Sequence, residues 1–149
     1  NRGIDADVTE GYLNRMESVY SVCPKVCFIM GGVNDIARKI PLENTIRNIR
    51  QICAGLKEHQ IIPVLQSVLY VADTYPEYEK MNISICRMNL ELERIASAND
   101  IRFVNLNQYL SSEKVLMTEY VLPDGIHLNG AGYVKWGAVL SRIFADYGL

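Results

Sequence analysis

Apolar residues along this chain follow two patterns, short unbroken runs and longer stripes in which they recur every three or four positions. The short runs are Val26–Met30, Ile61–Val68 and Ile101–Leu106. They are too short for helices and do not alternate with polar residues, which is typical of strands in a parallel sheet covered on both faces. We therefore predict three buried parallel strands.

The helical stripes lie between these runs and after the last one. They predict helices from Asp7 or Thr9 to about Val22, from about Glu43 to His59, from about Glu79 to Ala98, and from near Gly130 to about Tyr147. Ile36–Leu42 is predicted to be irregular, and Asn107–Gly125 loop-rich with a short helix around Ser112–Met117. Strands that alternate with long helices indicate βαβ units with right-handed crossovers, and hence an α/β fold.

Composition narrows the class of protein without assigning a function. The 149 residues are predicted to form one domain, 1–149, and they contain no apolar window long enough to span a membrane. A net charge of −2 gives no broad basic face for nucleic acid. The four cysteines form no C-x-x-C pair, and Cys27, Cys53 and Cys86, which lie in apolar segments, are predicted to be buried free thiols.

The first candidate for chemistry follows the Val26–Met30 strand. Gly31 and Gly32 allow a sharp turn, and Asn34 and Asp35 come directly after it. In open α/β sheets ligands bind at the carboxyl ends of the strands, where a side-chain amide can donate to a ligand oxygen. The alternative is that Asn34 and Asp35 are ordinary turn or cap residues.

The second candidate is the loop sequence Asp124-Gly125-Ile126-His127, just before the last predicted helix. Three-residue spacing in a tight turn lets the carboxylate accept a hydrogen bond from one imidazole nitrogen. That bond fixes the tautomer and leaves the other nitrogen as a base. Taken alone, the spacing favours the alternative, an ordinary Pro-Asp-Gly turn followed by a surface histidine.

Three stretches taken together resemble three of the four sequence blocks of the SGNH (GDSL-type) hydrolases. They are Asn1-Arg2-Gly3-Ile4, then Gly32-Val33-Asn34-Asp35, then Asp124-Gly125-Ile126-His127. Their order, separations and strand contexts match, and the resemblance covers essentially the whole chain. It implies a three-layer α/β/α flavodoxin-like parallel sheet and hydrolysis of acyl esters without a metal or cofactor.

The same resemblance implies roles for four residues. His127 would be the general base and Asp124 its orienting partner. The Gly3 backbone N–H and the Asn34 side-chain amide would form the oxyanion hole, together with the N–H of the nucleophilic serine. The implied substrates are small acyl esters, such as acetylated carbohydrates or short-acyl lipids.

One block of the family pattern has no counterpart here. The Gly-Asp-Ser block, which carries the nucleophile and lies upstream of the Gly3 block in the family, is absent from the sequence. We therefore expect the serine and the first two strands to lie upstream of this chain. The Val26–Met30 strand would then have an open edge, which we expect another chain, such as a second copy in a homo-oligomer, or rearranged pairing to cover.

Three other interpretations compete with this one. Ser67, near the end of a predicted strand, is a conceivable substitute nucleophile, although a serine in a parallel strand is usually structural and this one lacks a nucleophile-elbow context. The chain could instead be an inactive fragment or a non-catalytic binding module of the same fold. A flavodoxin-like nucleotide or flavin binder is disfavoured, because the chain has neither a G-x-G-x-x-G sequence nor a P-loop lysine.

Overall fold

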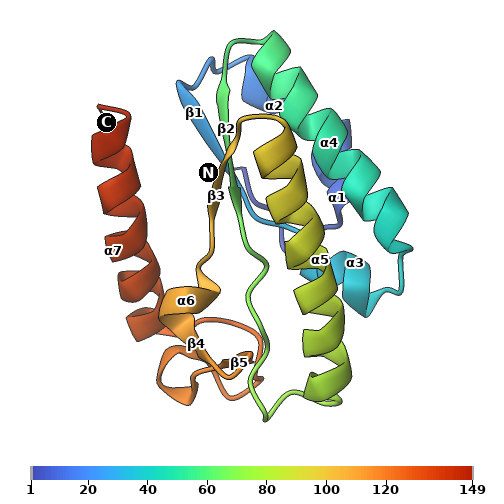
Figure 1. Ribbon diagram of the computed structural model, residues 1–149, viewed down its shortest axis with the longest axis vertical. Helices are drawn as coiled ribbons and strands as arrows, with labels where there is room; N and C mark the ends of the chain where they lie inside the picture. The colour runs from blue at the N-terminus through green and yellow to red at the C-terminus, as the bar shows by residue number, and fades with distance from the viewer. Residues whose placement is uncertain (1, 149) are drawn as a thin grey trace. The chain divides into compact units, whose positions relative to one another are not determined.

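A computed structural model describes residues 2–148, so Asn1 of the first matched stretch lies outside the described residues (Figure 1). Its helices are Thr9–Asn14 (α1), Glu17–Tyr20 (α2), Val33–Ala37 (α3), Leu42–Glu58 (α4), Tyr78–Ala98 (α5), Asn107–Leu110 (α6) and Gly130–Asp146 (α7), with a 3-10 turn at Thr118–Tyr120 (η1). Its strands are Val26–Ile29 (β1), Ile62–Gln66 (β2), Arg102–Val104 (β3), Ser111–Ser112 (β4) and Val115–Leu116 (β5).

The chain divides into two compact units. The strand unit comprises the chain up to Val68 together with Arg87–Val104, and the hairpin unit comprises Leu69–Cys86 together with the chain from Asn105. Helix α5 contributes its first half to the hairpin unit and its second half to the strand unit. The single domain predicted from chain length stays a prediction.

The strand unit contains the predicted parallel sheet. Its order is β1-β2-β3, with Val26 opposite Ile62 and Val64 opposite Arg102. Helix α4 buries a stripe that includes Ile49, Ile52 and Leu56, and it packs on β2 and beside α1 (Figure 1). The α/β class with a parallel sheet is therefore confirmed.

Two expectations about the first third of the chain are wrong. The first predicted helix is broken, because Arg15 and Met16 make i to i−3 hydrogen bonds that end α1 before α2 begins. The stretch after β1 is helical rather than irregular. Gly32 has φ +118°, a left-handed conformation that glycine adopts easily, and this sharp turn lets α3 begin at once. Asn34 and Asp35 therefore lie in the first turn of α3.

The short helix expected around Ser112–Met117 is a β-hairpin instead, formed by β4 and β5. Its two tip residues, Glu113 and Lys114, have φ of 49° and 63°. Two successive left-handed residues are the geometry of the tight turn that joins antiparallel strands, although here neither residue is a glycine. The hairpin packs inward through Leu116, which is fully buried.

Asparagine side chains satisfy the backbone just after β2. In the strand unit the Asn89 amide accepts from Val68 N at 2.8 Å and donates to Val68 O at 2.9 Å. In the hairpin unit Asn82 makes the same pair of bonds to Val71 N and O, at 2.8 Å and 2.9 Å. The two asparagines are two helical turns apart on α5, so one helix face replaces a neighbouring strand.

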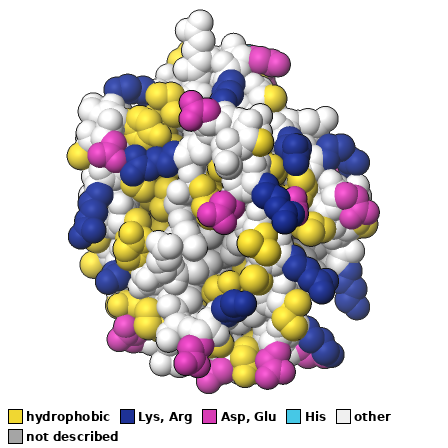
Figure 2. Space-filling model, viewed as in Figure 1, with side chains coloured by type: hydrophobic (Ala, Val, Ile, Leu, Met, Phe, Trp, Pro, Cys, Tyr) yellow, Lys and Arg dark blue, Asp and Glu magenta, His cyan; other side chains and the backbone are white. Residues whose placement is uncertain are grey.

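The surface and the remaining side chains add two observations. On the face shown in Figure 2, basic and acidic side chains are interspersed with hydrophobic ones. None of the described helices combines the length and the apolar character that crossing a membrane requires.

Candidate active site

Asn34 is held from the N-terminal segment of the strand unit. Its side-chain nitrogen donates to the carbonyl oxygen of Asp7 at 2.9 Å. A primary amide carries two N–H groups, so this bond sets the direction of the second one. Gly3 lies in the same unit and is exposed. Both predicted oxyanion donors therefore belong to one compact unit.

Asp35, the neighbour of Asn34, is an anchor inside that unit. It is 1% exposed, and its carboxylate accepts from Thr9 N at 3.0 Å and 3.3 Å, Thr9 Oγ1 at 2.6 Å and Thr45 Oγ1 at 3.1 Å. Asn48 Nδ2 donates to Thr9 Oγ1 at 3.1 Å and extends the network. The carboxylate thereby satisfies an N–H at the start of α1 that has no partner within the helix. The sequence offered no signal for this network beyond a polar residue next to Asn34.

Asp124 and His127 meet in the hairpin unit, as their spacing allows and the family resemblance implies. Asp124 Oδ2 lies 2.8 Å from His127 Nδ1. Because an ionised carboxylate can only accept, Nδ1 carries the hydrogen, and Nε2 presents its lone pair. The His127 side chain is 65% exposed, so this lone pair is accessible. Such a pair can accept a proton from a hydroxyl group.

The other oxygen of Asp124 binds the backbone of the same turn. Oδ1 accepts from the N–H groups of Ile126 and His127, each at 3.0 Å. These two backbone hydrogen bonds, His127 first, together with the imidazole bond, lower the pKa of Asp124 from its ordinary value of 3.8 to about 2. The carboxylate is therefore ionised throughout the physiological range of pH.

The rest of the hairpin unit fixes this turn at both ends. Gly125 has φ +76°, and its carbonyl accepts from Ala72 N at 2.8 Å. Leu122 N donates to His127 O at 2.7 Å, and Asn129 caps α7 by accepting from Gly132 N at 3.0 Å. The dyad therefore stands on a braced loop between η1 and α7.

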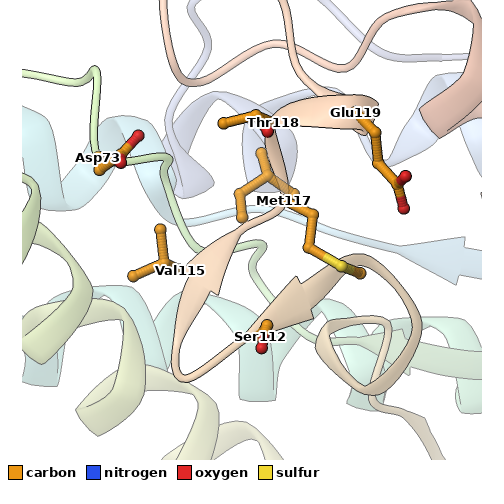
Figure 3. Close-up of a pocket in the computed structure, with 7 residues that line it drawn as sticks. Asp73, Ser112, Val115, Met117, Thr118 and Glu119 are labelled. Atoms are coloured by element: carbon orange, nitrogen blue, oxygen red, sulfur yellow. The ribbon is translucent and has the colours of Figure 1, made fainter.

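An open pocket of about 380 Å³ lies in the same unit (Figure 3). Its lining residues include Asp73, Ser112, Val115, Met117, Thr118 and Glu119. Asp73 directly follows Ala72, the residue bonded to Gly125, so one segment serves both the pocket and the dyad turn. Carboxylates and hydroxyls beside apolar groups suit a small polar ligand. The sequence did not indicate this pocket, because most of its lining comes from the β4-β5 hairpin and the residues after it, and a short helix was predicted there.

Ser67 is not placed to act on a substrate. It is completely buried, and its N–H donates to Val104 O at 2.9 Å within the sheet. Ser18, Ser84 and Ser141 each donate a side-chain hydrogen bond to a backbone carbonyl three or four residues earlier. Among the described residues no group of three or more histidine, cysteine or acidic side chains could hold a metal ion.

The structure thus brings Asp124 and His127 together, and Gly3 and Asn34 both belong to the other unit. The convergence of His127 with Gly3 and Asn34 on one cleft stays a prediction.

Known proteins resemble this chain in sequence and in structure. Residues 1–135 match the model of the GDSL-like Lipase/Acylhydrolase family. An isoamyl acetate-hydrolyzing esterase from Saccharomyces cerevisiae is 25% identical over 130 residues, a match that takes in 78% of this chain and 55% of the yeast protein. The chain therefore spans little more than half the length of this relative.

Two solved structures illustrate the shared fold. A GDSL-like lipase from Bacteroides thetaiotaomicron superimposes with a TM-score of 0.87 at 28% identity, covering 98% of this chain and 75% of that one. An acetylxylan esterase from Geobacillus stearothermophilus superimposes with a TM-score of 0.79 at 21% identity, covering 95% and 69%. The family match extends over most of the sequence, and the parallel sheet agrees with the fold of these structures. The chain belongs to the GDSL-like lipase/acylhydrolase family.

Proposed function

We propose that this chain carries the base and the oxyanion donors of a serine ester hydrolase that cleaves small acyl esters. His127 is the general base, Asp124 orients it, and Gly3 N–H and the Asn34 amide bind the oxyanion. The nucleophilic serine lies in sequence upstream of these 149 residues. The observation that carries the proposal is the hydrogen-bonded pair of Asp124 and His127, with Nδ1 engaged and Nε2 accessible.

The reaction proceeds in two steps that use the same groups. In the first, Nε2 of His127 takes the serine hydroxyl proton while Oγ bonds to the acyl carbon, and the carbonyl electron pair moves onto oxygen. Collapse of this intermediate breaks the bond to the alcohol oxygen, which receives the proton from the imidazolium. In the second step water replaces the serine, and the acid is released.

The two donors act on the charge that develops between these states. An oxyanion needs hydrogen-bond donors that already point at its position, and loss of one such donor costs about 10²–10³ in rate. The second N–H of Asn34 has its direction set by the Asp7 carbonyl, which suits this role. Each proton and electron pair in the two steps is accounted for by the serine, the imidazole, the ester and water.

Two observations support a serine supplied from outside these 149 residues. Ser67 is buried, and three other serines, Ser18, Ser84 and Ser141, are bonded to backbone carbonyls three or four residues earlier. The yeast esterase is also considerably longer than the matched region. Strand β1 pairs with β2 on one side, and its other edge pairs with no strand among the described residues. We propose that upstream residues add strands along this open edge. A second copy of the chain is the alternative cover for that edge.

The acyl group we propose is small, of the size of acetyl. The yeast relative is named for hydrolysis of isoamyl acetate. The Geobacillus protein, whose fold this chain shares, is named as an acetylxylan esterase. The proposed substrate is an acetylated carbohydrate or a short-acyl lipid. The competing function is a non-catalytic module of the same fold.

The test compares the 149-residue chain with the protein encoded by the open reading frame that contains it. Both are assayed for p-nitrophenyl acetate hydrolysis and treated with a fluorophosphonate, and the adducts are read by intact mass and peptide mapping. We expect one labelled serine and turnover in the longer protein, and neither in the chain alone. Labelling of a serine within the chain would overturn the assignment of the nucleophile. An unlabelled, inactive longer protein would favour the non-catalytic module.

A further inference from the structure

Both proposed oxyanion donors depend on one short segment, Arg2–Thr9, which we call the strap. Gly3 lies within the strap, and Asn34 donates its side-chain hydrogen bond to the strap carbonyl of Asp7 at 2.9 Å. A displacement of the strap would therefore misdirect both donors at once. The question is what holds the strap in place.

Arg15, just after α1, contacts the strap at its start, Arg2, and again at Asp7. Its Nε donates to the carbonyl of Arg2 at 3.3 Å, and its Nη1 is ion-paired with the Asp7 carboxylate. In a trans peptide the C=O and the following N–H point in opposite directions. By holding the Arg2 carbonyl, Arg15 therefore directs the Gly3 N–H away from itself. The guanidinium is itself stacked over the Tyr12 ring at 4.7 Å, which limits its movement.

Asp35 holds the other end. The buried carboxylate accepts from both the N–H and the hydroxyl of Thr9, the hydroxyl at 2.6 Å. Asp35 follows Asn34 in the first turn of α3, so the anchor and the donor move together. The distance from Thr9 back to the Asp7 carbonyl is only two residues, which leaves little freedom between the anchor and the group that orients Asn34.

The middle of the strap is bent and held as well. Ala6 has φ 53°, a conformation that residues other than glycine rarely adopt, and its carbonyl accepts from Arg38 Nη2 at 2.7 Å. Asp7 Oδ1 accepts from Val8 N at 2.9 Å. A segment of eight residues that is fixed at its start, middle and end has the properties expected of a preorganised support.

We propose that Arg15 and Asp35 are positioning residues of the oxyanion hole, which they preorganise by clamping the strap at its two ends. The inference rests on the proposed function, because that proposal assigns the donor role to Gly3 and Asn34. Neither Arg15 nor Asp35 touches the substrate. Their effect is to remove the reorganisation that mobile donors would need as the charge develops.

The first test is spectroscopic and needs no nucleophile. In ¹⁵N-labelled 149-residue chain, the Asn34 side-chain amide and the Gly3 backbone amide are followed by NMR in the R15M and D35N variants, with R94M as the control. Arg94 is also paired with a carboxylate, that of Glu91, but on the exposed face of α5. We expect R15M to move chiefly the Gly3 signal and D35N the Asn34 signals, with hydrogen exchange of the Asn34 amide at least tenfold faster. Unchanged Gly3 and Asn34 signals in folded R15M and D35N would overturn the inference.

The second test measures rate in the serine-containing protein. R15M is expected to lower kcat by about 10- to 100-fold with KM within twofold, because the donors act on the transition state rather than on the bound ester. R15K should recover part of the loss by restoring one of the two contacts, and R94M should match the parent. An equal loss through KM alone would overturn the positioning role. Full activity of N34A would instead disprove the proposed oxyanion hole, while the NMR result would still report whether the clamp exists.

Discussion

Asp35 and Asp124 each organise one half of the proposed site, and their surroundings are opposite. Asp35 is 1% exposed and binds groups from α1 and α4 that are distant in sequence. The Asp124 side chain is 46% exposed, and its partners Ile126 and His127 lie within three residues of it. Both carboxylates accept several hydrogen bonds, yet one ties separate elements together and the other shapes a single turn.

This difference separates stability from catalysis. When a buried carboxylate is removed, its buried partners keep no hydrogen bond and no water. Each of these unsatisfied groups then destabilises the folded state by its desolvation free energy. An exposed carboxylate can be replaced by water at little cost. We therefore expect loss of the buried Asp35, on the donor side, to weaken the fold, and loss of the exposed His127 side chain, on the base side, to weaken the reaction with little effect on the fold.

The largest expected effect is on the base side. In the serine-containing protein, H127A should lower kcat/KM for p-nitrophenyl acetate by about 10⁴-fold or more, since the general base is lost. The free energy of unfolding, measured by urea titration, should change by less than about 0.5 kcal/mol, because the side chain is exposed.

The matched control for that change is H59A, at the only other histidine. His59 stacks on Tyr20 with ring centroids 3.8 Å apart and bonds to its own helix through Nδ1, at 2.8 Å from Gly55 O. Its removal should leave the rate unchanged. A rate loss in H59A as large as that in H127A would contradict the assignment of the base.

The next effect is on the donor side. D35A should destabilise the 149-residue chain by about 3 kcal/mol, because the N–H and hydroxyl of Thr9 and the hydroxyl of Thr45 lose their buried acceptor. D124A should shift the midpoint of the same urea titration only slightly, because water can replace its exposed carboxylate. Equal shifts for the two variants would show that burial does not distinguish the two carboxylates.

A smaller effect is expected from G125A. The residue has φ +76°, and an added Cβ would lie 2.7 Å from Tyr75 N and 2.8 Å from Thr74 Oγ1. Left-handed strain and this contact together should destabilise the chain by about 2 kcal/mol.

Gly137 offers the opposite case. It lies inside α7, and an added Cβ would have nothing within 4 Å of it, so G137A should stabilise the chain by about 0.5–1 kcal/mol.

Local sequence patterns predicted those parts of the molecule that depend on local physics. The apolar runs located both ends of each of the three sheet strands to within about two residues, because burial on both faces demands such runs. The spacing of Asp124 and His127 allowed their hydrogen bond, and the resemblance to the hydrolase blocks is what turned this possibility into a prediction.

Features that depend on contacts between distant residues were not predicted. Asn82 and Asn89 bind the backbone after β2 at residues 11 and 21 positions away. An asparagine within a helical pattern carries no sequence signal for such a partner. The clamp of Asp35 on Thr9 spans 26 positions. The β4-β5 hairpin was missed because its turn uses Glu113 and Lys114, where the usual signal is Asn-Gly or Asp-Gly.

The smallest effect concerns the charge of Asp124 and asks what holds it. Its pKa is lowered from 3.8 to about 2, with the backbone N–H of His127 as the largest cause, that of Ile126 next, and the imidazole after them. A lowered folded-state pKa contributes stability above the ordinary value, and this contribution is lost as pH falls from about 4 to about 2. D124N should therefore make the free energy of unfolding depend less on pH between about 4 and about 2.

The carboxyl titration, followed by ¹³C NMR, separates the two sources of that shift. H127A keeps both backbone N–H groups, so the midpoint of Asp124 should remain well below its ordinary value. G125A disturbs the turn that aims those N–H groups, so it should raise the midpoint further than H127A does. The reverse order would mean that the imidazole, rather than the turn, keeps the carboxylate charged. In that case the hydrogen bond to His127 would be the main interaction that stabilises the charged Asp124. Asp124 and the buried Asp35 would then differ only in how exposed they are.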